Sequence, residues 1–133
     1  MSDQAAFLRK VILVVEDQEM VRRMIVRALR GEGYTVFEAR NGEVALNVLA
    51  TGVPVDLVVT DIVMPGMGGF QLADRLQLAD HPPILLFITG YDRDASTVPG
   101  PLLHKPFDPE RLAHEVKSLI GQAVRAGAEK PSA

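Results

Sequence analysis

Cysteine and tryptophan are both absent from the 133-residue sequence, and aromatic residues make up only 5% of it. Without cysteine the chain forms neither a disulfide framework nor a thiolate metal site. No apolar run approaches the roughly 20 residues of a membrane-spanning helix, and residues 1–10 lack the apolar stretch of a signal peptide. The net charge of -3 gives no reason to expect nucleic acid as a partner. These absences predict a small cytoplasmic domain without membrane insertion.

Short apolar runs alternate with segments of helical periodicity along most of the chain. The runs are too short for helices and rich in β-branched residues, which predicts strands at 11–15, 34–38, 57–59, 84–88 and 102–104. Apolar residues recur at helical spacing in 21–29, 44–49, 70–78 and 112–120, and at most a short helix fits 94–98. This alternation predicts an α/β sandwich whose parallel sheet is covered on both faces.

We expect one domain, residues 11–124, with an N-terminal extension at 1–10 and a disordered C-terminal tail at 125–133. The nucleotide-binding patterns G-x-x-x-x-G-K-[ST] and G-x-G-x-x-G do not occur, and neither does the hydrolase pattern G-x-S-x-G. The function therefore has to be sought in residues that the fold brings together.

Polar residues follow four of the five predicted strands. Glu16 and Asp17 follow the first strand, Asp61 the third, Thr89 the fourth and Lys105 the fifth. Each has an ordinary explanation alone, as a helix cap or a surface lysine. In a parallel α/β sheet, however, ligands bind outside the carboxyl ends of the strands, so these side chains are expected to meet.

The expected cluster has the composition of a phosphoryl-transfer site. Three close carboxylates repel one another unless a cation lies among them, and oxygen ligands favour Mg²⁺. Lysine and a hydroxyl group are suited to hold phosphoryl oxygens during transfer onto a carboxylate. Gly90 and the glycines after Pro65 would leave room for a donor.

Four separated segments resemble the signature segments of one family, the receiver domain of two-component response regulators. In order, they read VILVVEDQEMVRRMI, DLVVTDIVMPGMGG, LLFITGY and LLHKPF. The resemblance implies a flavodoxin-like (βα)5 fold with strand order 2-1-3-4-5. It also implies that Asp61 accepts phosphate from a histidine kinase or a histidine phosphotransfer protein.

The resemblance assigns further roles to single residues. It implies that Asp17, Asp61 and the backbone carbonyl of Val63 bind Mg²⁺ directly, whereas Glu16 acts largely through water. It implies that Thr89 and Lys105 contact the phosphoryl group. Finally, it implies a cis peptide bond between Lys105 and Pro106.

The sequence departs from the family pattern at three places. The acidic pair is Glu16-Asp17, where the family most often has two aspartates. Leu102 stands where many receivers carry an aromatic residue that couples to the threonine, and Tyr91 is either a substitute that covers the site or a packed surface residue. The spacing from the threonine to the lysine is short, which predicts a truncated or irregular fourth helix.

Two functions remain open at this stage. The first is a signalling switch, not an ordinary enzyme, that assists its own phosphorylation and dephosphorylation and is read by a downstream protein. The alternative is a degenerate receiver that binds a partner without phosphorylation. An aspartyl-phosphate phosphatase is disfavoured because Val63 occupies the position of its general acid.

The resemblance implies that the first helix faces the partner kinase near Gln18, Met20 and Val21, and the arginines of this helix are expected on a solvated face. The three histidines do not have metal-ligand spacing.

Overall fold

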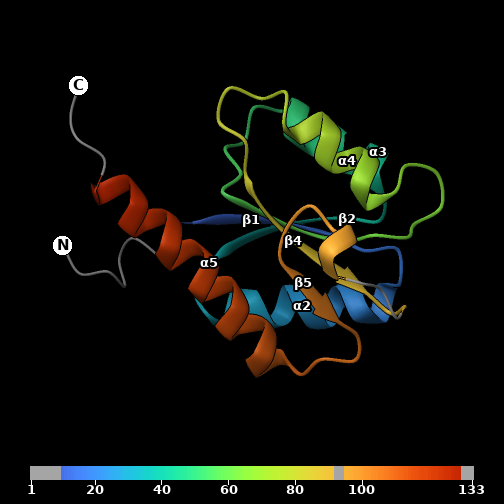
Figure 1. Cartoon of the computed structure of the whole chain (residues 1–133). Coiled ribbons are helices and arrows are strands. Elements are labelled where there is room, and N and C mark those ends of the chain that lie inside the picture. Colours follow the sequence, from blue (N-terminus) through green and yellow to red (C-terminus); the bar gives the residue numbers. More distant parts are fainter. Residues whose placement is uncertain (1–9, 92–94, 130–133) are drawn as a thin grey trace.

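The computed structural model describes residues 10–91 and 95–129, which form a parallel sheet between two layers of helices (Figure 1). The strand order β2-β1-β3-β4-β5 is the one that the family resemblance implied. The strands are β1 (Val11–Val15), β2 (Thr35–Ala39), β3 (Leu57–Asp61), β4 (Ile84–Thr89) and β5 (Leu102–His104). All neighbouring strands pair in parallel, so their carboxyl ends lie at one edge of the sheet.

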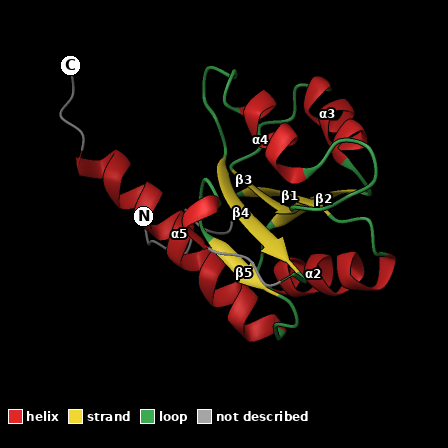
Figure 2. Cartoon of the chain, turned by 45° about the vertical axis from the view of Figure 1, so that its right-hand side comes forward, coloured by secondary structure: helices red, strands yellow, loops and turns green. Residues whose placement is uncertain are grey.

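Two pairs of helices cover the two faces of the sheet (Figures 1 and 2). The helices are α2 (Glu19–Gly31), α3 (Gly42–Ala50), α4 (Gly69–Leu76) and α5 (Pro109–Glu129). Successive residues of β1 point to opposite faces: Ile12 and Val14 pack in the cluster beneath α2 and α5, and Leu13 and Val15 pack beneath α3 and α4. This explains why the strands read as continuous apolar runs. Both of their faces are buried.

The segment between β4 and β5 is shorter than a full helical crossover. Its described residues contain one 3-10 helix, Ala95–Thr97, so four α-helices flank the sheet instead of the five that the (βα)5 formula implied. Val98 is buried in the cluster beneath α3 and α4, and Gly100 approaches the ring of Phe87 closely. The short segment therefore covers the end of the sheet with few residues, as the spacing predicted.

Two helix ends differ from the sequence-based boundaries. Helix α4 ends at Leu76, and Leu78, expected in its apolar stripe, is 82% exposed. Helix α5 continues to Glu129, so residues 125–129, expected in the tail, are helical. Ala126 and Ala128 favour this extension because alanine has the highest helix propensity. Residues 1–9 of the predicted extension and 130–133 of the predicted tail lie outside the described residues. No described helix has the length and apolar character to span a membrane.

Candidate functional site

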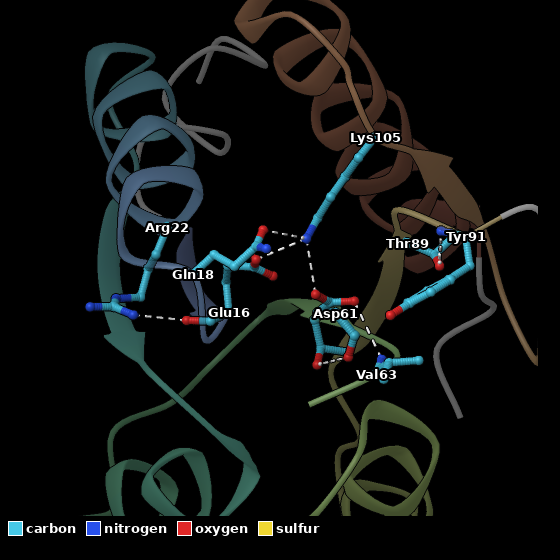
Figure 3. A network of polar contacts seen from close by, with 9 residues as sticks. Glu16, Gln18, Arg22, Asp61, Val63, Thr89, Tyr91 and Lys105 are labelled. Carbon is cyan, nitrogen blue, oxygen red and sulfur yellow. Dashed lines mark hydrogen bonds and ion pairs between the residues drawn. The ribbon is translucent and has the colours of Figure 1, made fainter. Parts of the chain in front are cut away.

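The carboxyl ends of three strands bring charged side chains together at one edge of the sheet (Figure 3). Lys105, directly after β5, donates hydrogen bonds from Nζ to Glu16 Oε1 at 2.8 Å and to Asp61 Oδ2 at 2.9 Å. Glu16 directly follows β1, and Asp61 is the last residue of β3. These three residues are far apart in the sequence, and it is the parallel strand order that makes them neighbours.

Asp61 is held rigidly because the whole of β3 is buried. Only 5% of the residue is exposed, and its Oδ1 accepts a hydrogen bond from the backbone N–H of Val63 at 3.3 Å. The Thr60 hydroxyl donates to the Asp61 carbonyl at 2.9 Å. The loop that follows turns back on itself, since the N–H of Gly69 donates to the carbonyl of Ile62 at 2.8 Å.

Two glycines of this loop are required by its backbone conformation and close packing. Gly66 has a φ of 77°, a left-handed conformation that glycine adopts without strain. A Cβ atom on Gly69 would overlap the carbonyl oxygen of Asp61, so the start of α4 can approach the end of β3 only without a side chain. Close backbone packing is therefore a requirement at Gly69, separate from the expected room for a donor.

Glu16 is completely buried, and its Oε2 has no hydrogen-bond partner among the described residues. Burial has the largest influence on the carboxyl group of Glu16 and raises its pKa to about 7. The hydrogen bond from Lys105 lowers this pKa, and the neighbouring Asp61 raises it further. For Lys105, burial lowers the pKa, but the hydrogen bonds to Glu16 and Asp61 outweigh burial and raise it. The lysine is therefore a fixed positive charge between two carboxyl groups.

The site provides a set of oxygen ligands that fits a hard divalent cation. Glu16, Asp17 and Asp61 each offer a carboxylate oxygen, and these atoms lie within 4.8 Å of one another. Asp17 is exposed to solvent, so an ion entering the cluster keeps access to water. The unpartnered Oε2 of buried Glu16 is an acceptor that a cation or its water would satisfy. The residues present therefore suit Mg²⁺, which binds few carboxylates and keeps waters.

Thr89 and its neighbours form the other wall of the site. Thr89, the last residue of β4, is fully buried, and its hydroxyl oxygen accepts a hydrogen bond from the N–H of Tyr91 at 3.1 Å. Tyr91 is 62% exposed, and Figure 3 shows its ring extending toward Asp61 and Val63. A Cβ atom on Gly90 would meet Lys105 Cδ at 3.8 Å, an ordinary contact, so a small side chain would fit there.

The backbone around Lys105 aims its side chain at the site. Its N–H donates to the Thr89 carbonyl at 2.7 Å, and the Lys105–Pro106 peptide bond is cis, as the family resemblance implied. Leu102 is half-buried and packs against the apolar cluster beneath α3 and α4. Its side chain thus packs at the margin of the apolar core.

Gln18, directly before α2, and Arg22 of α2 belong to the site, although sequence reasoning placed them on the surface of the helix. Gln18, the residue before the helix, accepts from Lys105 Nζ through Oε1 at 3.4 Å. Arg22 donates from Nη1 to the backbone carbonyl of Glu16 at 2.9 Å and pairs with Glu38 at 3.0 Å. Arg22 therefore supports the site and does not lie on a solvated face. The spacing of four residues between Gln18 and Arg22, which places both on one side of the helix, was the available signal.

The histidines take no part in the acidic cluster. Among the described residues, the group able to hold a metal ion consists of Glu16, Asp17 and Asp61.

Comparisons with known proteins identify relatives of this fold and site. The family model described as the response regulator receiver domain matches residues 12–117. The chain is 42% identical over 117 residues to the sensor kinase CckA of Brucella abortus, a match that covers 82% of this chain but 12% of the kinase. It is 37% identical over 118 residues to the response regulator receiver protein CpdR of the same species, covering 84% of this chain and 97% of CpdR.

A solved structure agrees with these sequence matches. The receiver domain of the hybrid histidine kinase CckA superimposes with a TM-score of 0.73 at 35% sequence identity. The superposition covers 83% of this chain and 98% of that domain. The two chains therefore share the same arrangement of sheet and helices across nearly the whole described region.

Proposed function

The chain belongs to the response regulator receiver domain family, and on that premise we propose that Asp61 is its phosphoacceptor in a Mg²⁺-dependent reaction. Receiver domains are signalling modules of two-component systems that accept phosphoryl groups and interact with histidine kinases or phosphotransferases. The observation that carries the proposal is the contact of Lys105 with both Asp61 and Glu16 at the edge of the sheet. A buried carboxylate beside a fixed cation is prepared to receive a group whose negative charge must be neutralised.

The proposed metal ligands are Asp17, Asp61 and the backbone carbonyl of Val63, with Glu16 acting largely through water. When bound, Mg²⁺ would neutralise charge on the transferring phosphoryl group. The protein's own contribution is to hold the acidic oxygens close together at the end of two buried strands. The orphaned Oε2 of Glu16 supports this role, because a buried carboxylate oxygen without a partner is costly.

In the proposed reaction a carboxylate oxygen of Asp61 attacks the phosphorus atom of a phosphorylated histidine. A P–O bond forms, and the P–N bond breaks with its electron pair returning to the imidazole nitrogen; no atom is oxidised or reduced. The ammonium group of Lys105 moves from Asp61 to a phosphoryl oxygen. The Thr89 hydroxyl donates a hydrogen bond to another phosphoryl oxygen. The buried position of Thr89 supports this assignment, because moving it would disturb β4 and transmit phosphorylation to the surface.

The donor is proposed to be a histidine kinase or a histidine phosphotransfer protein, and the recipient of the signal is an unidentified downstream protein. Exposed Met20, 86% accessible near the site on α2, supports contact with a protein donor at this edge. Tyr91 is proposed to cover Asp61 and slow hydrolysis of the phosphorylated form. We assign the chain no role in nucleic-acid binding.

Intact-mass spectrometry tests the proposal. The protein is incubated with a small phosphodonor, with and without Mg²⁺, as the wild type and as Asp61→Asn. The expected result is one phosphate adduct that requires both Mg²⁺ and Asp61. An adduct that persists in Asp61→Asn would contradict the assignment of the acceptor. The absence of any adduct on folded protein would instead favour the alternative, a receiver that binds its partner without phosphorylation.

A further inference from the structure

Arg22, in the first turn of α2, connects the edge strand β2 to the turn that carries the acidic pair. Only 15% of its side chain is exposed. Its Nη1 donates to the backbone carbonyl of Glu16 at 2.9 Å (Figure 3). Its Nε donates to Oε1 of Glu38, a residue of β2, at 3.0 Å. The donors of a guanidinium group have a fixed planar geometry, so the contact with Glu38 holds the contact with Glu16 in place.

The peptide unit between Glu16 and Asp17 is the point at which Arg22 acts on the site. A peptide unit is planar, so a hydrogen bond to the Glu16 carbonyl also fixes the direction in which the chain enters Asp17. On its other side, the N–H of Glu16 donates to the carbonyl of Ala39 at 3.1 Å. The backbone of Glu16 is therefore held from both sides, by β2 directly and by β2 through Arg22.

Asp17 depends on this backbone more than the other two members of the acidic cluster do. The side chains of Glu16 and Asp61 are buried, and each accepts a hydrogen bond from Lys105. Asp17 is exposed and lies between β1 and α2, and its carboxylate has no hydrogen bond or ion pair with any of the described residues. The direction of the Asp17 side chain is therefore set by the backbone and not by side-chain contacts.

We propose that Arg22 is a positioning residue for the metal site, holding Asp17 through the Glu16 carbonyl in the direction that binds Mg²⁺. This inference rests on the proposed function, in which Asp17 is a metal ligand. A ligand whose backbone is already ordered loses less conformational freedom when the ion binds, so the ion binds more tightly. Glu38 contributes only by orienting Arg22, although it lies on a strand that supplies no residue to the acidic cluster.

The charge of Arg22 alone would have the opposite effect on Mg²⁺ binding, which makes the inference testable by its sign. Removing a positive charge near the carboxylates reduces repulsion of the ion and should tighten binding. If Arg22 positions Asp17, Arg22→Met should instead weaken binding by about fivefold or more, because one residue must then be ordered by the ion. Arg23→Met makes the same change at the next position, where the arginine is 73% exposed and pairs with Glu19, and should not weaken binding. Isothermal titration calorimetry with MgCl₂ measures the dissociation constants.

Variants of Glu38 separate the hydrogen bond to Arg22 from the charge of the carboxylate. Glu38→Gln and Glu38→Ala both remove the negative charge, but only the glutamine keeps an acceptor for Nε of Arg22. Glu38→Ala should therefore bind Mg²⁺ more weakly than Glu38→Gln. The double variant Arg22→Met/Glu38→Ala should bind it as Arg22→Met does, because Glu38 acts through Arg22. The Glu38 variants also provide the test should Arg22→Met fail to fold.

Hydrogen exchange of the Glu16 amide gives a readout on the metal-free protein. Its exchange should be faster in Arg22→Met than in Arg23→Met, because the turn is held from one side only. A dissociation constant for Mg²⁺ in folded Arg22→Met equal to or lower than that of Arg23→Met would overturn the inference, even if urea denaturation showed a loss of stability. Equal binding by Glu38→Ala and Glu38→Gln would also overturn it. Absence of Mg²⁺ binding by the wild type is a different result, because it would overturn the metal requirement of the proposed function and this inference with it.

Discussion

The ammonium group of Lys105 holds the buried carboxyl groups of Glu16 and Asp61 together at the edge of the sheet. A divalent ion at the same site would use oxygens of the same carboxyl groups. The lysine and the metal ion are therefore both expected to neutralise the phosphoryl group during transfer. Before transfer, however, they compete for the same carboxylate oxygens of Glu16 and Asp61. This relation makes the two functions of Lys105 separable by experiment.

Replacing Lys105 by methionine should affect metal binding and phosphorylation in opposite directions. Removing the positive charge should tighten Mg²⁺ binding by roughly 1 kcal/mol, since charge repulsion at this distance is of that order or larger. Phosphorylation by a small donor should slow by about tenfold or more, because a group that stabilises transferring charge is lost. Isothermal titration calorimetry and timed intact-mass spectra measure the two effects. Lys117→Met, at an exposed position of α5, is the control and should change neither. Weaker Mg²⁺ binding in Lys105→Met would contradict the competition.

Tyr91 offers a test of how water reaches Asp61. Tyr91→Ala removes the ring that extends toward Asp61 and should accelerate hydrolysis of the aspartyl phosphate by about two- to fivefold, because water is excluded less well. The hydrogen bond to Thr89 survives, since its donor is the backbone N–H of residue 91. Decay of the phosphorylated mass measures the lifetime. Tyr91→Phe keeps the ring and should retain the wild-type lifetime; equal lifetimes in all three proteins would refute shielding.

At the residue level, sequence reasoning worked where a strand end fixed the position. Glu16, Asp17, Asp61 and Lys105 come together as expected, because the parallel register brings residues after neighbouring strands to one edge. It failed for Gln18 and Arg22, whose contacts depend on how the first turns of α2 lie against the site. Helix periodicity gives the face of a residue but not the direction of a long polar side chain.

The junction between β3 and α4 is the element on which the position of Asp61 most directly depends. Gly69→Ala places a Cβ atom against the Asp61 carbonyl, and the backbone cannot yield without moving the loop. We expect a loss of about 1–3 kcal/mol in the free energy of unfolding, as for overpacked core positions. Urea denaturation measures it. Gly31→Ala, at the end of α2 where a Cβ has open space, should be neutral or stabilising by up to about 1 kcal/mol. Equal stability of the two variants would contradict the close approach.

The ends of α4 and α5 show what periodicity leaves undecided among elements. Leu78 continues the apolar spacing of α4 but lies beyond its last turn, where it lines a groove at the amino end of the sheet. An apolar residue at helical spacing can thus lie exposed at the surface as well as in the core. Beyond Val124 the apolar stripe stops, yet α5 continues to Glu129, because helix propensity does not require a buried face.

For the whole molecule, the strand order was predictable and the covering of the sheet was predictable only in part. Four separated sequence segments carry the family resemblance, and that resemblance predicted the strand order β2-β1-β3-β4-β5. The short segment between β4 and β5 contains the 3-10 helix Ala95–Thr97 in place of an α-helix. The short spacing from Thr89 to Lys105 predicted a truncated or irregular helix there but not its conformation. Its packing depends on Val98 and on the close approach of Gly100 to Phe87, contacts between residues that no sequence period connects.

Mg²⁺ should stabilise the entire fold, because the proposed ligands come from strands that are adjacent only in the folded protein. At ten times its dissociation constant the ion adds about 1.4 kcal/mol to the free energy of unfolding. For a domain of this size that is a rise of about 5 °C in Tm. Differential scanning calorimetry, with potassium chloride at equal ionic strength as reference, measures the rise.

Asp17→Asn should lose most of this Mg²⁺-dependent rise, since it removes an exposed charged ligand without disturbing the buried core. Asp74→Asn makes the same change at an exposed position of α4 and should keep the rise in full. If Asp17→Asn and Asp74→Asn respond to Mg²⁺ alike, Asp17 is not a ligand. If potassium chloride alone reproduces the wild-type rise, the stabilisation is general charge screening and the three carboxyl groups do not act as one metal site.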